Sequence, residues 1–481
     1  MEPGVDVWRV AHASKVAVIV DADAYFRQLR TAMLQARRRI MLVGWDFDAR
    51  IPLDRGERLP GEPRTVGGFI HWLVERTPEL EIHLLRWEFG ALKTLFRGTT
   101  LFTLLRWMRH PRITTKLDGH HPIGASHHQK IVVIDDCLAF CGGIDVTSER
   151  WDTCGHVDAE PGRRTPWGLS YKPWHDATNC VEGEVAAALG AIARDRWRLA
   201  GGAPLEPLAP LEPCWPDGLP VDFEDVPVGI ARTIPELPDI EPVFESEALF
   251  LSLIARAKRH IYVESQYFAS RRIAEAIARR LDEPGGPEIV IVNPRHAQGW
   301  LEPIAMDTAR ARLMAALWQR DGERRLRMYH PVTAGGADIY CHAKILIVDS
   351  DVFRLGSSNM NNRSLRLDTE CDLVIEAPDE VARGTIARIR AELLAEHLGS
   401  TPGEVSRLIA ETGSLIETVE RLRGGGKTLD PYEIPELNGV TKWLADNEVL
   451  DPEGPDQMFE PLSKRGLLRR LRRPRQRRKR A

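Results

Sequence analysis

Two copies of a pattern that suits chemistry on a phosphate group stand out in this sequence. The order His-x-Lys-x4-Asp occurs at His128, Lys130 and Asp135 and recurs at His342, Lys344 and Asp349. After six intervening residues, the first copy continues with Gly142-Gly143 and the second with Gly356-Ser357. An imidazole can attack phosphorus or transfer a proton, and an ammonium group can neutralise a phosphoryl oxygen. The repeat predicts two half-sites that join into one active site for an anionic substrate.

The repeat also includes the elements that must position these residues. Residues 36–45 are typical of a helix end that leads into a strand, and residues 257–266 repeat this pattern. Short apolar runs at 131–134 and 345–348 are typical of buried strands. We therefore expect an α/β fold with two pseudo-symmetric α/β halves. Each half is a mixed β-sheet flanked by helices, with one active site at their interface.

Length and composition suit this organisation. The chain has 481 residues, of which 43% are hydrophobic, and this is enough for two cores. Six prolines between Pro204 and Pro220 disfavour helix and central strand alike, so a linker is expected there. The expected parts are a first half at 1–200, a Pro-rich linker at 201–226, a second half at 227–400, a helical extension at 401–463 and a basic tail at 464–481.

On these residues the chain resembles the phospholipase D superfamily, whose signature is the doubled motif followed by Gly-Gly or Gly-Ser. The resemblance covers about residues 30–400. Accessory stretches resemble phospholipase D proper at 44–48, 142–145, 150–153, 173–176 and 263–268. One departure is Asp145, because many members of the superfamily carry Asn there and a carboxylate has no amide donor.

A phosphodiester repels nucleophiles, so an enzyme must supply positive charge where the phosphoryl oxygens gain negative charge. Lys130 and Lys344 are expected to serve there, with hydrogen bonds from Ser357 and Asn359. No acidic cluster has metal-ligand spacing near either motif, so we expect metal-independent catalysis without a cofactor.

The two histidines must hold opposite protonation states. The resemblance implies that His128 is the nucleophile and His342 the general acid. The repeat aligns Asp176 with Glu370, and each is expected to accept a hydrogen bond from its histidine. Asp135 and Asp349 complete the catalytic motif. Each follows a strand, so capping of a turn is favoured over direct chemistry.

Cysteines and hydropathy bear on the compartment. The seven cysteines form no CxxC pair and no Cys/His cluster at zinc spacing, so we expect reduced thiols in a cytoplasmic protein. We expect no signal peptide, because a basic region followed by a long apolar run is missing at the N-terminus. No transmembrane span is expected either, because no apolar run reaches about 18 residues.

Two segments could contact a lipid surface. Residues 464–481 carry eleven lysines and arginines and no acid, while the rest of the chain is acidic. Interleaved leucines suit a helix on an anionic membrane, and a disordered solubilising or nucleic-acid-binding tail is the alternative. Residues 86–108 mix aromatic, leucine and basic residues, which suits an interfacial surface or an ordinary packing helix.

Four functions fit these patterns to different degrees. A phospholipase D that hydrolyses phosphatidylcholine or phosphatidylethanolamine is favoured, with the phospholipid as its partner. A phosphatidyltransferase similar to cardiolipin synthase is second, because a lipid alcohol can resolve the same intermediate. A nuclease is disfavoured because the acidic body repels nucleic acid. A non-enzymatic membrane-binding module is disfavoured by two intact motifs.

Overall fold

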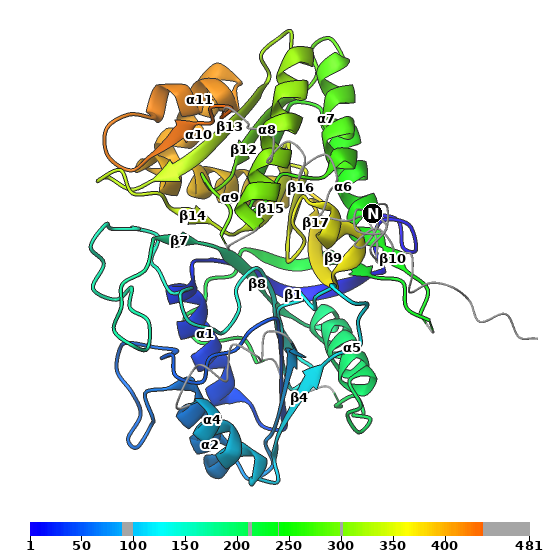
Figure 1. The fold of residues 1–481 in the computed structure, drawn as a ribbon, viewed down its shortest axis with the longest axis vertical. Helices are drawn as coiled ribbons and strands as arrows, with labels where there is room; N and C mark the ends of the chain where they lie inside the picture. The colour runs from blue at the N-terminus through cyan, green and yellow to red at the C-terminus, as the bar shows by residue number, and fades with distance from the viewer. Residues whose placement is uncertain (89–99, 210–213, 239, 299–301, 436–481) are drawn as a thin grey trace, which may run out of the picture.

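A computed structural model of the protein describes residues 1–88, 100–209, 214–238, 240–298 and 302–435 (Figure 1). The basic tail at 464–481 and the end of the extension lie outside these residues, as does part of the segment 86–108. In the described part of the chain, no helix combines the length and apolarity needed to cross a membrane.

The first half alternates strands and helices, as expected. Its elements are β1 (Arg9–Val20), α1 (Ala22–Gln35), β2 (Arg39–Gly44), α2 (Val66–Arg76), β3 (Glu81–Trp87), α4 (Thr100–Met108), β4 (Ile113–Asp118), β5 (Ile131–Ile134), β6 (Leu138–Gly142), β7 (Trp174–His175), β8 (Ala177–Glu182) and α5 (Glu184–Leu199). Strands β2 and β5 are the ones predicted from the sequence.

The second half repeats this order. Its elements are β9 (Phe223–Ile234), β10 (Val243–Phe244), α6 (Glu245–Arg256), β11 (His260–Ser265), α7 (Arg271–Asp282), β12 (Glu288–Val292), α8 (Glu302–Arg320), β13 (Leu326–Val332), β14 (Tyr340–Cys341), β15 (Lys344–Val348), β16 (Val352–Gly356), the π-helix η1 (Arg363–Leu367), β17 (Glu370–Glu376) and α9 (Glu380–Leu398). Strands β11 and β15 confirm the predicted counterparts of β2 and β5.

The two halves share one sheet with mirrored strand order. The order runs β13-β12-β11-β15-β16-β17-β9 in the second half and continues as β1-β8-β6-β5-β2-β3-β4 in the first. The join is the antiparallel pair β1·β9, with Ala11 opposite Val228. Figure 1 shows the first half below this join and the second half above it. Two pseudo-symmetric halves are thereby confirmed.

Helices cover both faces of the sheet. Helices α5 and α9 bury one continuous core, which spans both halves and includes Leu189, Ile386 and Leu393. On the opposite face each half has a separate core, under α1 and α2 in the first and under α6, α7 and α8 in the second. The shared core and the shared sheet fix the halves relative to each other.

The extension differs from the expected purely helical segment. Helices α10 (Pro402–Thr412) and α11 (Leu415–Leu422) are followed by strand β18 (Thr428–Pro431), which pairs antiparallel with β13. An isolated strand-forming stretch of four residues has no clear pattern, so only pairing with an available sheet edge reveals it.

The expectation that all cysteines are reduced is wrong for one pair. Cys137 and Cys214 form a disulfide across 77 residues of sequence, and the other five cysteines are free thiols. Sequence spacing signals only local pairs, whereas Cys214 meets Cys137 because the chain after α5 returns to the start of β6. The cysteine pattern therefore gives no support to a reducing compartment.

Candidate active site

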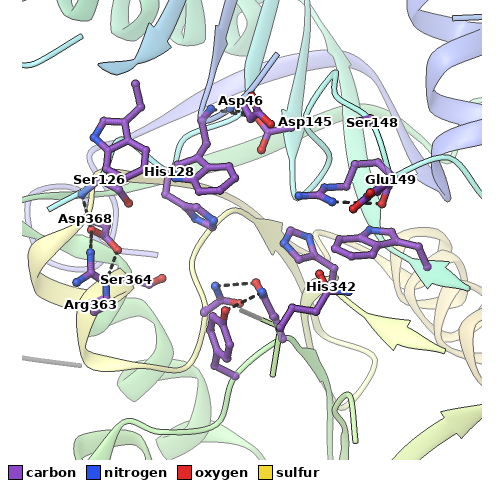
Figure 2. Close-up of a pocket in the computed structure, with 18 of the residues that line it drawn as sticks. Asp46, Ser126, His128, Asp145, Ser148, Glu149, His342, Arg363, Ser364 and Asp368 are labelled. Atoms are coloured by element: carbon purple, nitrogen blue, oxygen red, sulfur yellow. Dashed lines mark hydrogen bonds and ion pairs between the residues drawn. The ribbon is translucent and has the colours of Figure 1, made fainter. Parts of the chain in front are cut away.

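A cavity of about 710 Å³ lies between the two halves and is lined by both motif histidines. Figure 2 shows His128 and His342 pointing into the same space from opposite sides. Side chains from both halves complete the wall, including Ser126, Asp145, Glu149, Asn359 and Asp368. The structure thus brings the two half-sites together, as the repeat predicts.

Each histidine is anchored by the opposite half of the molecule. The His128 amide donates to the Thr369 carbonyl at 2.9 Å, and the His342 amide donates to the His175 carbonyl at 2.7 Å. Strand β14, just before His342, also pairs in parallel with β7. These exchanged backbone contacts fix both imidazoles at the interface.

The supporting carboxylates cross between the halves. His128 Nδ1 lies 3.0 Å from both carboxylate oxygens of Glu370, and His342 Nδ1 lies 2.6 Å from Asp176 Oδ2. Each carboxylate orients the imidazole of the other half and leaves its Nε2 toward the cavity. The alignment of Asp176 with Glu370 found these two residues, but it did not specify the exchange.

The small-residue turns make room for these carboxylates. A Cβ at Gly143 would collide with the carboxylate of Asp176. At the equivalent place in the second half, the Ser357 hydroxyl donates to Glu370 Oε2 at 2.5 Å. Ser357 therefore holds Glu370 rather than a phosphoryl oxygen, which corrects the role expected from the sequence.

The two lysines have different partners. Lys130 Nζ donates to the His128 carbonyl at 2.8 Å and lies 3.3 Å from Asp145 Oδ2. Lys344 Nζ donates to the His342 carbonyl and, at 3.2 Å, to Gln266 Oε1. The carboxylate of Asp145 thus gives Lys130 an ionic partner.

Asp135 and Asp349 do not line the cavity. The Asp135 carboxylate accepts backbone hydrogen bonds from Arg37, Arg38 and Arg39 at 2.7–2.8 Å. Asp349 accepts the same three bonds at the start of β11, at 2.7–3.0 Å. Both residues hold the connection into the neighbouring strand, so their assignment to the catalytic set is replaced by a structural role.

Burial decides the protonation of the site. Burial and the two lysines lower the pKa of both His128 and His342 well below its usual value. Burial also raises the pKa of Asp176 and of Glu370. Because burial disfavours the charged form of each partner, the neutral forms of the histidine and of its carboxylic acid are both favoured in the free site.

Burial lowers the pKa of Lys344 to about 7. An anion bound between the lysines would favour the protonated forms of Lys344 and of both imidazoles. A bound phosphodiester therefore promotes the charge that its cleavage requires on Lys344 and on the general acid, whereas the attacking imidazole must stay neutral.

Three buried residues and the partly buried Glu396 lie close together beside this site and could hold a metal ion. His175 Nδ1 lies 2.8 Å from Glu396 Oε1 and 3.6 Å from Asp21 Oδ1, and His156 Nε2 lies 3.0 Å from Glu396 Oε1 and 3.4 Å from Asp21 Oδ2. One possible ligand atom from each of the four residues lies within 4.8 Å of the other three. A tetrahedral ion with bonds of about 2.1 Å separates its ligands by about 3.4 Å. We name these four residues the buried tetrad.

The outer contacts of the buried tetrad also suit a metal site. The second nitrogen of His156 lies 3.0 Å from Asp152, and that of His175 lies 2.7 Å from Glu264. Such carboxylates orient metal-bound imidazoles. Asp21 Oδ2 is buried and accepts no hydrogen bond, and its nearest cationic contact is His156 Nε2 at 3.4 Å.

No local pattern in the sequence indicates this set, because its four residues lie far apart in the chain and only the fold brings them together. None of the four is among the residues that line the cavity. A cation held there would therefore support the site rather than contact the phosphate.

Aromatic and basic side chains outside the two motifs stack on one another in and beside the cavity wall. The Arg150 guanidinium stacks 4.2 Å from the centre of Trp174, whose ring centre lies 4.9 Å from that of His342. Trp45 and Trp87 stack at 5.8 Å in the cavity wall. The accessory stretches that resemble phospholipase D contain Arg150, Trp174 and Trp45, so these motifs were the available signal.

Comparisons with known proteins agree with this geometry. Residues 250–390 match the family described as "Cardiolipin synthase, PLD-like domain". Phospholipase D alpha 1 of Vigna unguiculata is 24% identical over 79% of this chain and 64% of its own length. Phospholipase D A of Dictyostelium discoideum is 24% identical over 80% of this chain and 36% of its own length. The chain thus spans less than two thirds of the length of these relatives.

Among solved structures, the phosphatidylserine synthase of Haemophilus influenzae Rd KW20 has a TM-score of 0.55 and 13% identity. The match covers 85% of this chain and 95% of that chain. These sequence matches, together with two His-x-Lys motifs that face one cavity across a mirrored sheet, support membership in the phospholipase D superfamily.

Proposed function

We propose that the protein is a phospholipase D, which hydrolyses a glycerophospholipid to phosphatidic acid and a free headgroup alcohol. The observation that carries this proposal is the pair of imidazoles in one cavity, each oriented by a carboxylate of the opposite half. The curated relatives named phospholipase D support the same reaction type.

The geometry supports a two-step reaction. His128 attacks phosphorus through Nε2, the bond from phosphorus to the headgroup oxygen breaks, and His342 donates a proton to that oxygen. His342 then takes a proton from water while the water oxygen attacks phosphorus, and the bond to His128 breaks. Lys130, Lys344 and Asn359 stabilise the phosphoryl oxygens during both steps.

The cavity wall supports a headgroup that carries an amine. Aromatic rings attract cationic groups over their faces, and quaternary ammonium ions are recognised in this way. Trp45, Trp87, Trp174 and Tyr267 line the cavity together with two acidic residues, Asp46 and Glu149. Phosphatidylcholine and phosphatidylethanolamine fit these features, and phosphatidylcholine makes fuller use of the rings.

Transfer of the phosphatidyl group to an alcohol is the second candidate. It is favoured by the match to the cardiolipin synthase family and by the likeness to a phosphatidylserine synthase fold. The two candidates share the phosphohistidine intermediate and differ only in whether water or an alcohol resolves it.

One assay distinguishes hydrolysis from transfer. The protein is incubated with labelled phosphatidylcholine and a short primary alcohol, with His128→Ala as the inactive control. Phosphatidic acid supports hydrolysis, and a predominance of phosphatidylalcohol supports transfer. Absence of both products, with wild-type protein correctly folded, contradicts the proposal.

We also propose that the protein acts peripherally on membranes and that the basic tail at 464–481 contributes to binding. Each lysine or arginine near an anionic surface contributes about 1 kcal/mol, and salt weakens this attraction. Removal of the tail is expected to reduce sedimentation with anionic vesicles at low salt. Unchanged sedimentation would assign the tail another role.

A further inference from the structure

An ordered turn beside the cavity exposes two large apolar side chains. Trp167 and Leu169 are each 66% exposed, and both contribute to the lining of the cavity. Single exposed apolar residues are common on protein surfaces, but neighbouring large ones at a functional opening mark a contact surface. We call residues 164–170 the mouth turn.

The mouth turn is held rigidly by its own backbone. The Gly168 amide donates to the Thr165 carbonyl at 2.8 Å, and the Thr165 amide donates to the Leu169 carbonyl at 2.8 Å. Arg164 and Ser170 close the turn as an antiparallel bridge. Gly168 has a φ of 82°, a conformation that strains other residues. The side chains of Trp167 and Leu169 are thus presented without a further cost of ordering the backbone.

The mouth turn and its immediate flanks are basic in sequence, in contrast to the net negative charge of the whole chain. Residues 161–173 contain three basic residues and no acid, whereas the chain as a whole has a net charge of −4. Arg163 is buried against Asp152, and Arg164 and Lys172 are exposed. The Arg50 guanidinium lies 5.2 Å from the centre of the Trp167 ring. An apolar tip beside exposed basic groups suits the boundary between lipid headgroups and acyl chains.

We propose that the mouth turn is an interfacial anchor that inserts Trp167 and Leu169 into a lipid surface containing anionic lipid. This inference rests on the proposed function and identifies how the cavity reaches its substrate. With the turn inserted, the mouth of the cavity faces the headgroup layer. A phospholipid then enters without passing through bulk water, which avoids exposing its acyl chains.

The first test compares a double variant, Trp167→Ser with Leu169→Ser, against Val381→Ser in the full chain. Val381 is 78% exposed at the start of α9 and is not part of the cavity wall, so it controls for loss of an exposed apolar side chain. Vesicles of phosphatidylcholine with phosphatidylglycerol are titrated, and the bound fraction is measured by co-sedimentation. Melting temperatures verify folding.

The double variant is expected to bind these vesicles about 10- to 100-fold more weakly, because two large side chains no longer leave water. The Val381→Ser protein should bind like the wild type. The ratio of turnover on vesicles to turnover on a monomeric short-chain phospholipid should fall in parallel in the double variant. Equal vesicle binding by the double variant and the wild type overturns the inference.

A second variant, Trp167→Phe, tests whether the indole ring of Trp167 enters the bilayer. Phenylalanine preserves an apolar side chain, so binding should persist, while quenching of tryptophan fluorescence by brominated acyl chains should decrease. Identical quenching in the variant and the wild type would place Trp167 outside the bilayer. If the wild type binds vesicles through the mouth turn but hydrolyses phospholipid neither in vesicles nor as monomers, the proposed function is wrong. The inference that the mouth turn anchors the protein to lipid is then still supported.

Discussion

The crossed carboxylates allow the roles of the two histidines to be separated by experiment. Asp176→Asn removes the carboxyl group beside His342, and Glu370→Gln removes the carboxyl group beside His128. Each change preserves the shape of a buried side chain that lies within 2.6–3.0 Å of its imidazole. An amide does not stabilise the imidazolium as a carboxylate does, so proton transfer or attack by the affected histidine is impaired.

The expected magnitude follows from the contribution of acid–base catalysis. On phosphatidylcholine the headgroup leaves as an alkoxide that needs a proton, so Asp176→Asn should lower kcat about 10²- to 10⁴-fold. This equals about 3 to 5 kcal/mol of lost transition-state stabilisation. Glu370→Gln should cause a loss of the same order, because attack by His128 is impaired.

A phosphatidyl nitrophenol ester distinguishes the two variants, because nitrophenolate leaves without a proton. In a rapid-mixing assay, Asp176→Asn and His342→Ala should release about one nitrophenol per active site and then slow, since His342 is still required to activate water. Glu370→Gln and His128→Ala should show no such burst. Asp282→Asn, an exposed residue paired with Arg320, serves as the matched control.

The opposite pattern would refute this reasoning. If Glu370→Gln gives the burst and Asp176→Asn does not, His342 is the nucleophile and the roles are reversed. If both variants lose activity equally on both substrates, the carboxylates do not divide the work.

Three other predictions follow from the same structure. Because burial lowers the pKa of Lys344 to about 7, this ammonium loses its charge above that pH, so kcat/KM should fall as pH rises through about 7. The fall in kcat should occur at a higher pH than the fall in kcat/KM, because the bound phosphate favours the charged form of Lys344. If kcat/KM stays constant up to pH 9, the prediction is wrong. Asp135→Ala leaves three backbone amides without their acceptor and should lower the free energy of unfolding by about 1–3 kcal/mol, measured by urea denaturation. A divalent cation should raise the melting temperature of the EDTA-treated wild type but not of His156→Gln, and no rise in either protein would mean that the buried tetrad is held by its ion pairs alone.

The sequence alone was enough to predict the architecture, because the repeat consists of patterns between residues that are neighbours in the chain. Helix ends, short apolar strands and the doubled motif depend on neighbours in the chain, so β2, β5, β11 and β15 were predictable. The same repeat identified His128, His342, Asp176 and Glu370 as members of one site.

Only the tertiary structure decided how these members are connected. The exchange of carboxylates, the disulfide at Cys137, the strand β18 and the buried tetrad all join residues that lie far apart in the chain. No local pattern records such contacts, because they form when the halves pair through β1 and β9 and pack against a common core. The residue types are fixed by the chemistry of the site, whereas the partner of each residue is fixed by the geometry of the interface.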